Sequence, residues 1–226
     1  MKNVYLRLSI LIFIACCNCD LYAQVRDQFF TCRNEDYYSN GKFDSEKAKD
    51  AVITLCKYHG YPIHPNFREK LKVSDYGEGR FAEMGIAVNM VVNNQEDKYM
   101  LMEIFLLPGQ MLPEHRHLKG DDLPAKLEGW FIRHGMSYIV GVGKDNLDKF
   151  PDIKIPYCHN EATTKTKHVY PAYPGDFTKL LKEETLHWQF AGKEGAIMSE
   201  VANVHSSPLV RHADLEARIY FLNRAK

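Results

Sequence analysis

Short apolar runs separated by polar turn residues dominate the chain after Gly85. Each run has the length of a β-strand, and Gly, Pro, Asn and Asp residues stand between neighbouring runs. Many short strands with turns of this kind are typical of an all-β sandwich or barrel. We assign the following runs to strands: Ile86–Val92, Tyr99–Leu107, Glu128–Arg133, Ser137–Val142, His168–Tyr170, His187–Phe190, Ala196–Val201 and Ile219–Leu222.

Before Gly85, the apolar residues follow the spacing of a helix instead. Apolar residues recur at helical intervals over Ser45–Tyr58, with Asp44 or Ser45 as the N-cap and Gly60 as the stop signal. A short helical turn is expected at Asn66–Lys72, and residues 24–43 are polar and irregular. The pattern therefore predicts a short helical N-terminal cap that precedes the β-strands.

The domain organisation follows from these two patterns. Residues 24–83 are predicted to form the helical and irregular cap, and residues 84–226 are predicted to form the β-barrel. No internal repeat, low-complexity tract or linker divides this part of the sequence. All-β barrels often reach roughly 200–250 residues as one domain, so a single β domain is the natural interpretation of 226 residues.

The first 23 residues have the features of a signal peptide. Lys2 and Arg7 are basic, Leu8–Ala15 is apolar, and Ala23 is a small residue at an expected cleavage point. The apolar run is shorter than the ~20 residues that a membrane-spanning helix needs, so no integral membrane span is expected. We expect an exported protein, periplasmic or secreted. A lipid anchor at Cys16 and a buried strand or helix are the alternatives.

Composition narrows the function classes further. The chain has 29 Lys and Arg residues against 29 Asp and Glu residues, so it lacks the basic excess of a nucleic-acid-binding protein. Beyond the leader the cysteines are Cys32, Cys56 and Cys158. They allow at most one disulfide, such as Cys32–Cys56, and they contain no CxxC pair for a zinc knuckle.

Candidate metal ligands recur at strand spacing in two segments of the chain. Alternate side chains of a strand share a face, so His115 projects with His117, and Glu128 projects with Lys126 and Trp130. A later strand offers His187 as a fourth ligand. Imidazole and carboxylate ligands of this kind suit a divalent transition metal. The other histidines of the chain are expected at the surface or as hydrogen-bonded core residues: His59, His64, His134, His159, His168, His205 and His212.

The spacing around these residues resembles the first motif of the cupin superfamily. Gly109-Gln-Met-Leu-Pro-Glu-His115-Arg-His117 is followed by Glu128-Gly-Trp-Phe-Ile-Arg-His-Gly135. The insert Leu118–Leu127 between the histidines and the glutamate is longer than in the commonest form of this motif. The resemblance implies a cupin-type β-barrel, or jelly roll, with a metal centre inside it.

Longer phrases between residues 85 and 218 carry a closer resemblance. They are Leu107-Pro-Gly-Gln-Met-Leu-Pro-Glu-His-Arg-His117, Lys126-Leu-Glu-Gly-Trp130, Thr185-Leu-His-Trp-Gln-Phe-Ala-Gly192 and Glu194-Gly-Ala-Ile-Met-Ser-Glu200. These phrases resemble the D-lyxose isomerase family of metal-dependent, cupin-fold aldose–ketose isomerases. The resemblance implies a lyxose- or mannose-like sugar as substrate. Because cupins often dimerise, a homodimer is also an expectation of the resemblance.

The resemblance also implies roles for single residues. His115, His117, Glu128 and His187 are the expected ligands of a divalent metal, with manganese the first choice before zinc, cobalt, nickel or iron. Glu200 is the expected base that carries a proton between C1 and C2 of the sugar, and Lys126 is expected to contact a hydroxyl or polarise the carbonyl. Asp214 and Arg218 match the end of the family pattern as substrate-binding candidates. A salt-bridged strand residue is the alternative for Glu200, and a solvated lysine is the alternative for Lys126.

One segment departs from the family pattern. Ala202–Val210 replaces an acidic stretch that normally follows the glutamate, so the wall of the sugar site is expected to differ. Trp130, Trp188 and Phe190 are candidates for an apolar wall around the base. Two other functions use the same ligands: an exported cupin dioxygenase, and a cupin that binds a sugar without turnover.

Overall fold

The computed structural model describes residues 33–156 and 164–224. The predicted signal peptide, Cys32, Cys158 and His159 lie outside these residues. Cys56 is a free, buried thiol. Within the described ranges, no helix combines the length and the apolar character needed to cross a membrane.

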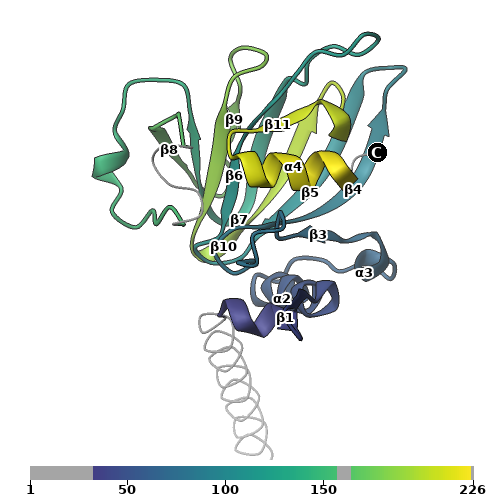
Figure 1. Ribbon diagram of the computed structural model, residues 1–226, viewed down its shortest axis with the longest axis vertical. Helices are drawn as coiled ribbons and strands as arrows, with labels where there is room; N and C mark the ends of the chain where they lie inside the picture. The colour runs from purple at the N-terminus through teal and green to yellow at the C-terminus, as the bar shows by residue number, and fades with distance from the viewer. Residues whose placement is uncertain (1–32, 157–163, 225–226) are drawn as a thin grey trace, which may run out of the picture.

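The architecture is a curled antiparallel β-sheet, with helices at its base and the C-terminal helix across its front in the view of Figure 1. This confirms the predicted all-β, cupin-type barrel with a helical N-terminal part. The strands of the main sheet are β3 Lys72–Ser74, β4 Ile86–Asn94, β5 Tyr99–Leu106, β6 Met111–His117, β7 Glu128–Gly141, β8 His168–Ala172, β9 Phe177–Lys179, β10 His187–Ala202 and β11 Val210–His212. The remaining elements are η1 Asn34–Tyr37, β1 Tyr38–Ser39, β2 Lys42–Phe43, α2 Ser45–Tyr58, α3 Phe67–Lys70, η2 Leu147–Lys149, η4 Ser207–Leu209 and α4 Leu215–Arg224.

The long strand β10 organises the barrel. One edge of β10 pairs with β7, and its other edge pairs first with β6 and then with β5. The β7–β10 register shifts near Gly135, which has a φ of +68°. A Cβ atom there would lie 2.0 Å from the carbonyl oxygen of Gly195, so only glycine lets the two strands approach this closely.

Two strands are longer than the sequence pattern predicts. Glu128–Arg133 and Ser137–Val142 form the single strand β7, and His187–Phe190 and Ala196–Val201 form the single strand β10. Glycines that read as turn residues in the sequence instead permit an irregularity within a continuous strand pair.

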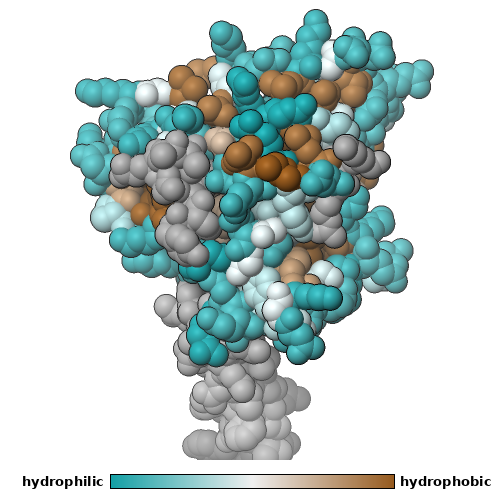
Figure 2. All heavy atoms as spheres, in the orientation of Figure 1, coloured by the Kyte–Doolittle hydropathy of each residue, from teal (hydrophilic) through white to brown (hydrophobic). Residues whose placement is uncertain are grey.

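The predicted strand at Ile219–Leu222 is wrong, because these residues belong to helix α4. The side chain of Asp214 accepts a hydrogen bond from the backbone N–H of Ala217, which is the geometry of a helix N-cap. A short apolar run does not by itself distinguish a strand from a helix. Figure 2 shows hydrophobic atoms on the face that α4 crosses, and Leu215 and Ile219 of this helix are exposed.

Helix α2 begins and ends where the sequence predicts. Asp44 caps it by accepting hydrogen bonds from the backbone N–H groups of Glu46 and Lys47. A cap of this kind contributes about 1 kcal/mol. The buried face of α2 packs with Phe105 and Ile197 on the outside of the sheet, and a second apolar cluster fills the barrel interior around Ile104, Ile132 and Met198. The helix thus supports the strands from outside and leaves the interior for the site.

Candidate metal centre

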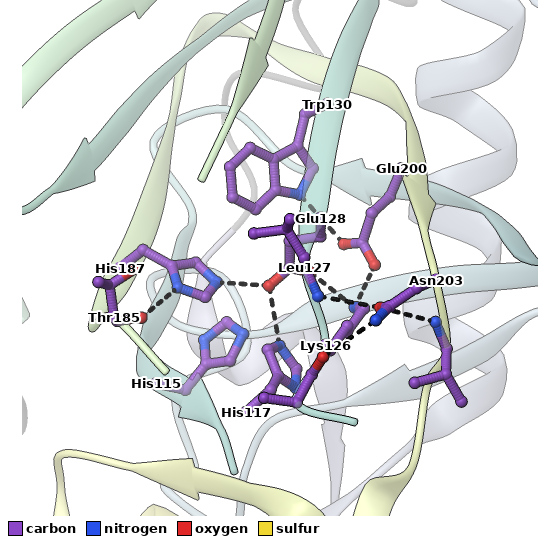
Figure 3. Close-up of polar contacts among 12 residues, drawn as sticks. His115, His117, Lys126, Leu127, Glu128, Trp130, Thr185, His187, Glu200 and Asn203 are labelled. Atoms are coloured by element: carbon purple, nitrogen blue, oxygen red, sulfur yellow. Dashed lines mark hydrogen bonds and ion pairs between the residues drawn. The ribbon is translucent and has the colours of Figure 1, made fainter. Parts of the chain in front are cut away.

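Three neighbouring strands bring the predicted metal ligands together inside the barrel (Figure 3). Strand β6 carries His115 and His117, β7 begins with Glu128, and β10 begins with His187. His187 lies directly opposite His115 in the β6–β10 register. One ligand atom from each of these four buried residues can be chosen so that all lie within 4.8 Å of one another.

Hydrogen bonds orient two of the imidazoles toward the common centre. Nδ1 of His115 donates to the carbonyl oxygen of Pro113 at 2.9 Å, and Nδ1 of His187 donates to that of Thr185 at 3.0 Å. These bonds leave the Nε2 lone pairs available as ligands. Oε1 of Glu128 lies 3.0 Å from His117 Nε2 and 3.1 Å from His187 Nε2, yet none of these three buried atoms has a hydrogen-bond partner. Unpartnered buried donors and acceptors that converge in this way fit a shared cation.

The electrostatics favour the protonation states that a metal requires. Burial holds the pKa of His115 well below its usual value and lowers the pKa of His117 to about 4, so both imidazoles are neutral at pH 7. Burial opposes ionisation of Glu128, but His117 and Lys126 outweigh it and hold its pKa well below the usual value. Neutral imidazoles and an ionised carboxylate are the forms that coordinate divalent ions.

A second carboxylate is connected to this centre through Lys126. The buried Lys126 ammonium forms an ion pair with Oε2 of Glu128 at 2.6 Å and another with Oε1 of Glu200. The indole N–H of Trp130, directly opposite Glu200 in the β7–β10 register, donates to Oε2 of Glu200 at 3.1 Å. Glu200 is therefore held by two donors on the same interior face as the metal ligands (Figure 3).

The structure also shows how the polypeptide before β7 is held. The side chain of Asn203 accepts a hydrogen bond from the backbone N–H of Leu127 and donates one to the carbonyl oxygen of Ala125. These bonds hold the end of the insert Leu118–Leu127 against the residue that follows β10. Lys126 is thereby directed into the interior, where it is 4% exposed, rather than into solvent as its alternative interpretation would require.

A cavity of about 650 Å³ adjoins the centre. Its described lining includes His115, His117, Lys126 and Glu200, together with apolar side chains from β4 and β5. Small-molecule sites commonly have volumes of about 300–1,000 Å³, so a monosaccharide fits this space. An ion pair with Lys126 would by itself be consistent with a purely structural role for Glu200. Its position on the cavity wall favours instead a role in contact with a bound ligand.

Comparison with known proteins places the chain in a family. No protein-family model matches it. The chain is 30% identical over 185 residues to the D-lyxose/D-mannose isomerase of Thermosediminibacter oceani, an alignment that covers 80% of the chain and 92% of that relative. It is also 30% identical over 158 residues to the D-lyxose ketol-isomerase of a Thermofilum species, covering 70% of the chain and 84% of the relative.

The chain belongs to the D-lyxose isomerase family.

Solved structures with the same fold include L-ribose isomerases. That of Cellulomonas parahominis with L-psicose superposes with a TM-score of 0.61 and 13% identity, over 78% of this chain and 94% of the other. That of Acinetobacter sp. DL28 with L-ribose gives 0.60 and 13% identity over 78% and 94% of the two chains. At this identity the likeness establishes the barrel fold of this D-lyxose isomerase family member.

Of the three aromatic residues predicted to surround the Glu200 carboxylate, only Trp130 contacts it. Trp188 and Phe190 belong to a cluster on the other side of the sheet with Met111 and Val140, where the Trp188 indole donates to the carbonyl oxygen of Thr166. Because successive side chains of a strand point to opposite faces of the sheet, Trp188 lies on the face opposite to that of His187. The opposite wall of the cavity comes from β4 and β5 instead.

His205 and His212, predicted to be surface or hydrogen-bonded core residues, line the cavity together with Tyr76. The His212 ring lies 5.5 Å from that of His115 and 4.9 Å from that of Tyr76, and the His205 ring lies 6.2 Å from that of His117. Tyr76 has a φ of +55°, which is uncommon for a bulky residue and often marks functional sites. His212 faces the centre because β11 pairs with β6. The local sequence of either strand does not predict this pairing.

Asp214 and Arg218 have structural contacts outside this cavity. Asp214 caps helix α4, and Nε of Arg218 donates to the carbonyl oxygen of His212 at 2.7 Å. Neither residue is among the described lining of the cavity. Their expected contact with sugar in this family member stays a prediction.

Proposed function

We propose that this protein is a metal-dependent aldose–ketose isomerase that acts on a lyxose- or mannose-like sugar by proton transfer between C1 and C2. The observation that carries the proposal is the buried Glu200 carboxylate, which lines the same cavity as the metal ligands His115 and His117 and is held there by Lys126 and Trp130. Membership of the D-lyxose isomerase family supports the same reaction class.

The metal would be held by His115, His117, Glu128 and His187, and it would supply Lewis-acid stabilisation of negative charge on the sugar oxygens. The first choice remains manganese, with zinc, cobalt, nickel and iron as alternatives. Imidazole and carboxylate ligands accept all of these ions, so the ligand set supports the class of metal.

Glu200 would act as the base. It would take the proton from C2 of an aldose and return it to C1, while the O2 hydroxyl proton moves to O1 and the carbonyl group passes from C1 to C2. Burial raises the pKa of Glu200 to about 7 against the opposing effect of the Lys126 ammonium. A base with a pKa near the working pH transfers a proton well in both directions.

Proton exchange in D2O tests the proposal. The protein is loaded in turn with Mn, Co, Ni, Zn and Fe(II) and incubated with D-lyxose, D-mannose and their ketoses, and exchange at C1 and C2 is followed by NMR. Metal-dependent exchange together with ketose formation is the expected result. Consumption of O2 without exchange would favour the dioxygenase, and sugar binding without either would favour the binding protein.

Trp130→Phe should move the acidic limb of the pH–rate profile to higher pH. Donation from the indole stabilises the ionised form of Glu200, so its loss raises the pKa of that carboxyl group. The base then becomes protonated, and activity falls, at a higher pH than in the parent protein. The measurement is kcat against pH. Trp188→Phe is the matched control, since its indole donates to Thr166 outside the cavity, and equal limbs in both variants would contradict the assignment.

His205→Ala should raise KM for the sugar about fivefold with little change in kcat or metal content. Nδ1 of His205 is buried and unpartnered at the cavity wall, while its backbone N–H and carbonyl oxygen are held by Asn93. Burial lowers the pKa of His205 to about 3, so a neutral imidazole is available to a sugar hydroxyl. A neutral hydrogen bond contributes about 1 kcal/mol. His64→Ala, on an exposed histidine outside the cavity, is the control. Equal KM values in the two variants would remove His205 from the sugar site.

We also propose that the protein is exported after cleavage behind Ala23, on the basis of the basic, apolar and small-residue order of the leader. Expression of the full chain followed by fractionation and mass spectrometry of the N-terminus is the test. A product that begins at Gln24 outside the cytoplasm is expected. An N-terminal lipid on Cys16 would support the anchored alternative, and an intact Met1 in the cytoplasm would contradict export.

A further inference from the structure

A second pocket, of about 440 Å³, lies on the side of β6 and β11 that faces away from the metal ligands. In β6, Arg116 alternates with His115 and His117, and in β11, Arg211 alternates with the buried Val210 and His212. Strand alternation therefore directs both arginines to the outer face. Figure 1 shows α4 close to these strands, and Arg218 of this helix also lines the pocket.

Like charges are placed directly opposite each other here. Arg116 and Arg211 are cross-strand partners in the β6–β11 register. Such a pair of like charges destabilises a sheet unless something offsets it. Lys165 and Arg218 add two further cations to the same pocket. The described lining residues include no carboxylate, and none of the three arginines forms an ion pair within the described part of the chain.

Main-chain contacts hold two of these guanidinium groups in place. Nη1 of Arg211 donates to the carbonyl oxygens of Pro208 at 2.6 Å and Val210 at 2.8 Å. Nε of Arg218 donates to the carbonyl oxygen of His212. The other N–H groups of both side chains have no partner among the described residues. A guanidinium anchored at one nitrogen presents its remaining donors in a fixed geometry.

The adjacent carboxylate does not neutralise the pocket. Glu114 is fully buried, and its oxygens accept hydrogen bonds from the backbone N–H groups of Lys165 and Thr166 and from the Thr166 hydroxyl. It is thus committed to holding the 164–166 segment in place and is not among the lining residues. Among the described residues around the pocket, no carboxylate pairs with Arg116, Arg211 or Arg218, so the positive charge of these arginines is not neutralised there.

We propose that Arg116, Lys165, Arg211 and Arg218 form a binding site for an oxyanion, the phosphate or carboxylate group of an acidic ligand, separate from the metal cavity. Arginine forks match both groups in geometry, and the pocket volume admits either a free ion or an acidic monosaccharide. His212 lines both this pocket and the metal cavity, so the two sites are back to back across β11.

The test is calorimetric titration of the metal-loaded protein with inorganic phosphate and with D-glucuronate, with D-glucose as the neutral comparison. The expected result is binding of one anion per chain that weakens as ionic strength rises, and no binding of glucose at this pocket. Tighter binding of phosphate or of glucuronate identifies the source of the group. Arg116→Gln should weaken anion binding about tenfold, because a charge-assisted hydrogen bond is lost.

Two further variants test the site, one as a control outside the pocket and one as a charge reversal within it. Lys193→Gln removes the same charge from an exposed site outside the pocket and should leave binding within about twofold. Arg116→Glu should abolish anion binding and raise the unfolding midpoint, because it replaces a like-charged cross-strand pair with an opposite one. Equal anion affinity in Arg116→Gln and the parent would overturn the proposal, since binding at the metal alone survives that change. A fall in the midpoint of Arg116→Glu would also overturn it.

Discussion

Glu200→Gln is expected to lower kcat for isomerisation by about 10²–10⁴-fold while the metal stays bound. Glutamine has nearly the shape of glutamate, so the variant keeps the packing of the side chain and loses its ability to take a proton. Glu200 is not among the four converging ligands, so the metal centre itself is unchanged by the substitution. The exchange of the C2 proton with solvent measures this step directly.

The chain offers a closely matched control for this variant. Glu103 is also a buried carboxylate, on the neighbouring strand β5, but it lies on the outer face of the sheet and accepts a hydrogen bond from Ser199 at 2.9 Å. Glu103→Gln should leave proton exchange within a few-fold of the parent. Exchange that survives Glu200→Gln would show that another group is the base. Loss of bound metal in that variant would show that the two parts of the site are not separable.

His117→Ala is expected to abolish stoichiometric metal binding and, with it, isomerisation. Neither nitrogen of the His117 imidazole has a hydrogen-bond partner in the described structure, so its removal breaks no other hydrogen bond. The main loss is one ligand of the centre. Metal content after dialysis and turnover with added metal are the two measurements.

Thermal unfolding separates this effect from misfolding. A ligand that binds only the folded state stabilises it by RT ln(1 + [L]/Kd), so metal should raise the unfolding midpoint of the parent and hardly that of His117→Ala. Without metal, the two proteins should unfold at similar temperatures. His168→Ala, on a histidine that contacts the carbonyl oxygen of Lys144 instead, should respond to metal as the parent does. A full metal-dependent shift in His117→Ala would remove His117 from the ligand set.

The spacing of residues along the chain determined much of the site. His115 with His117, and Glu128 with Trp130, share faces because a strand repeats every two residues, and this holds before any partner strand is known. Helix α2, with its Asp44 cap, is determined in the same local way. A later predicted strand offered His187 as a fourth ligand, and the family resemblance added Glu200. The structure places both on the interior face of the sheet.

Only the tertiary structure decided which distant residues meet. Strands β7 and β10 are continuous because glycines permit a close approach of two backbones, whereas the same glycines read as turns in the sequence. The β6–β11 register brings His212 to the cavity and places Arg116 opposite Arg211. His205 reaches the cavity because its loop is hydrogen-bonded to Asn93. Pairing between segments far apart in the chain depends on the packing of the whole barrel rather than on the composition of either segment. The sequence thus determined the chemistry of each strand, and the closure of the barrel decided how those strands combine into two back-to-back sites.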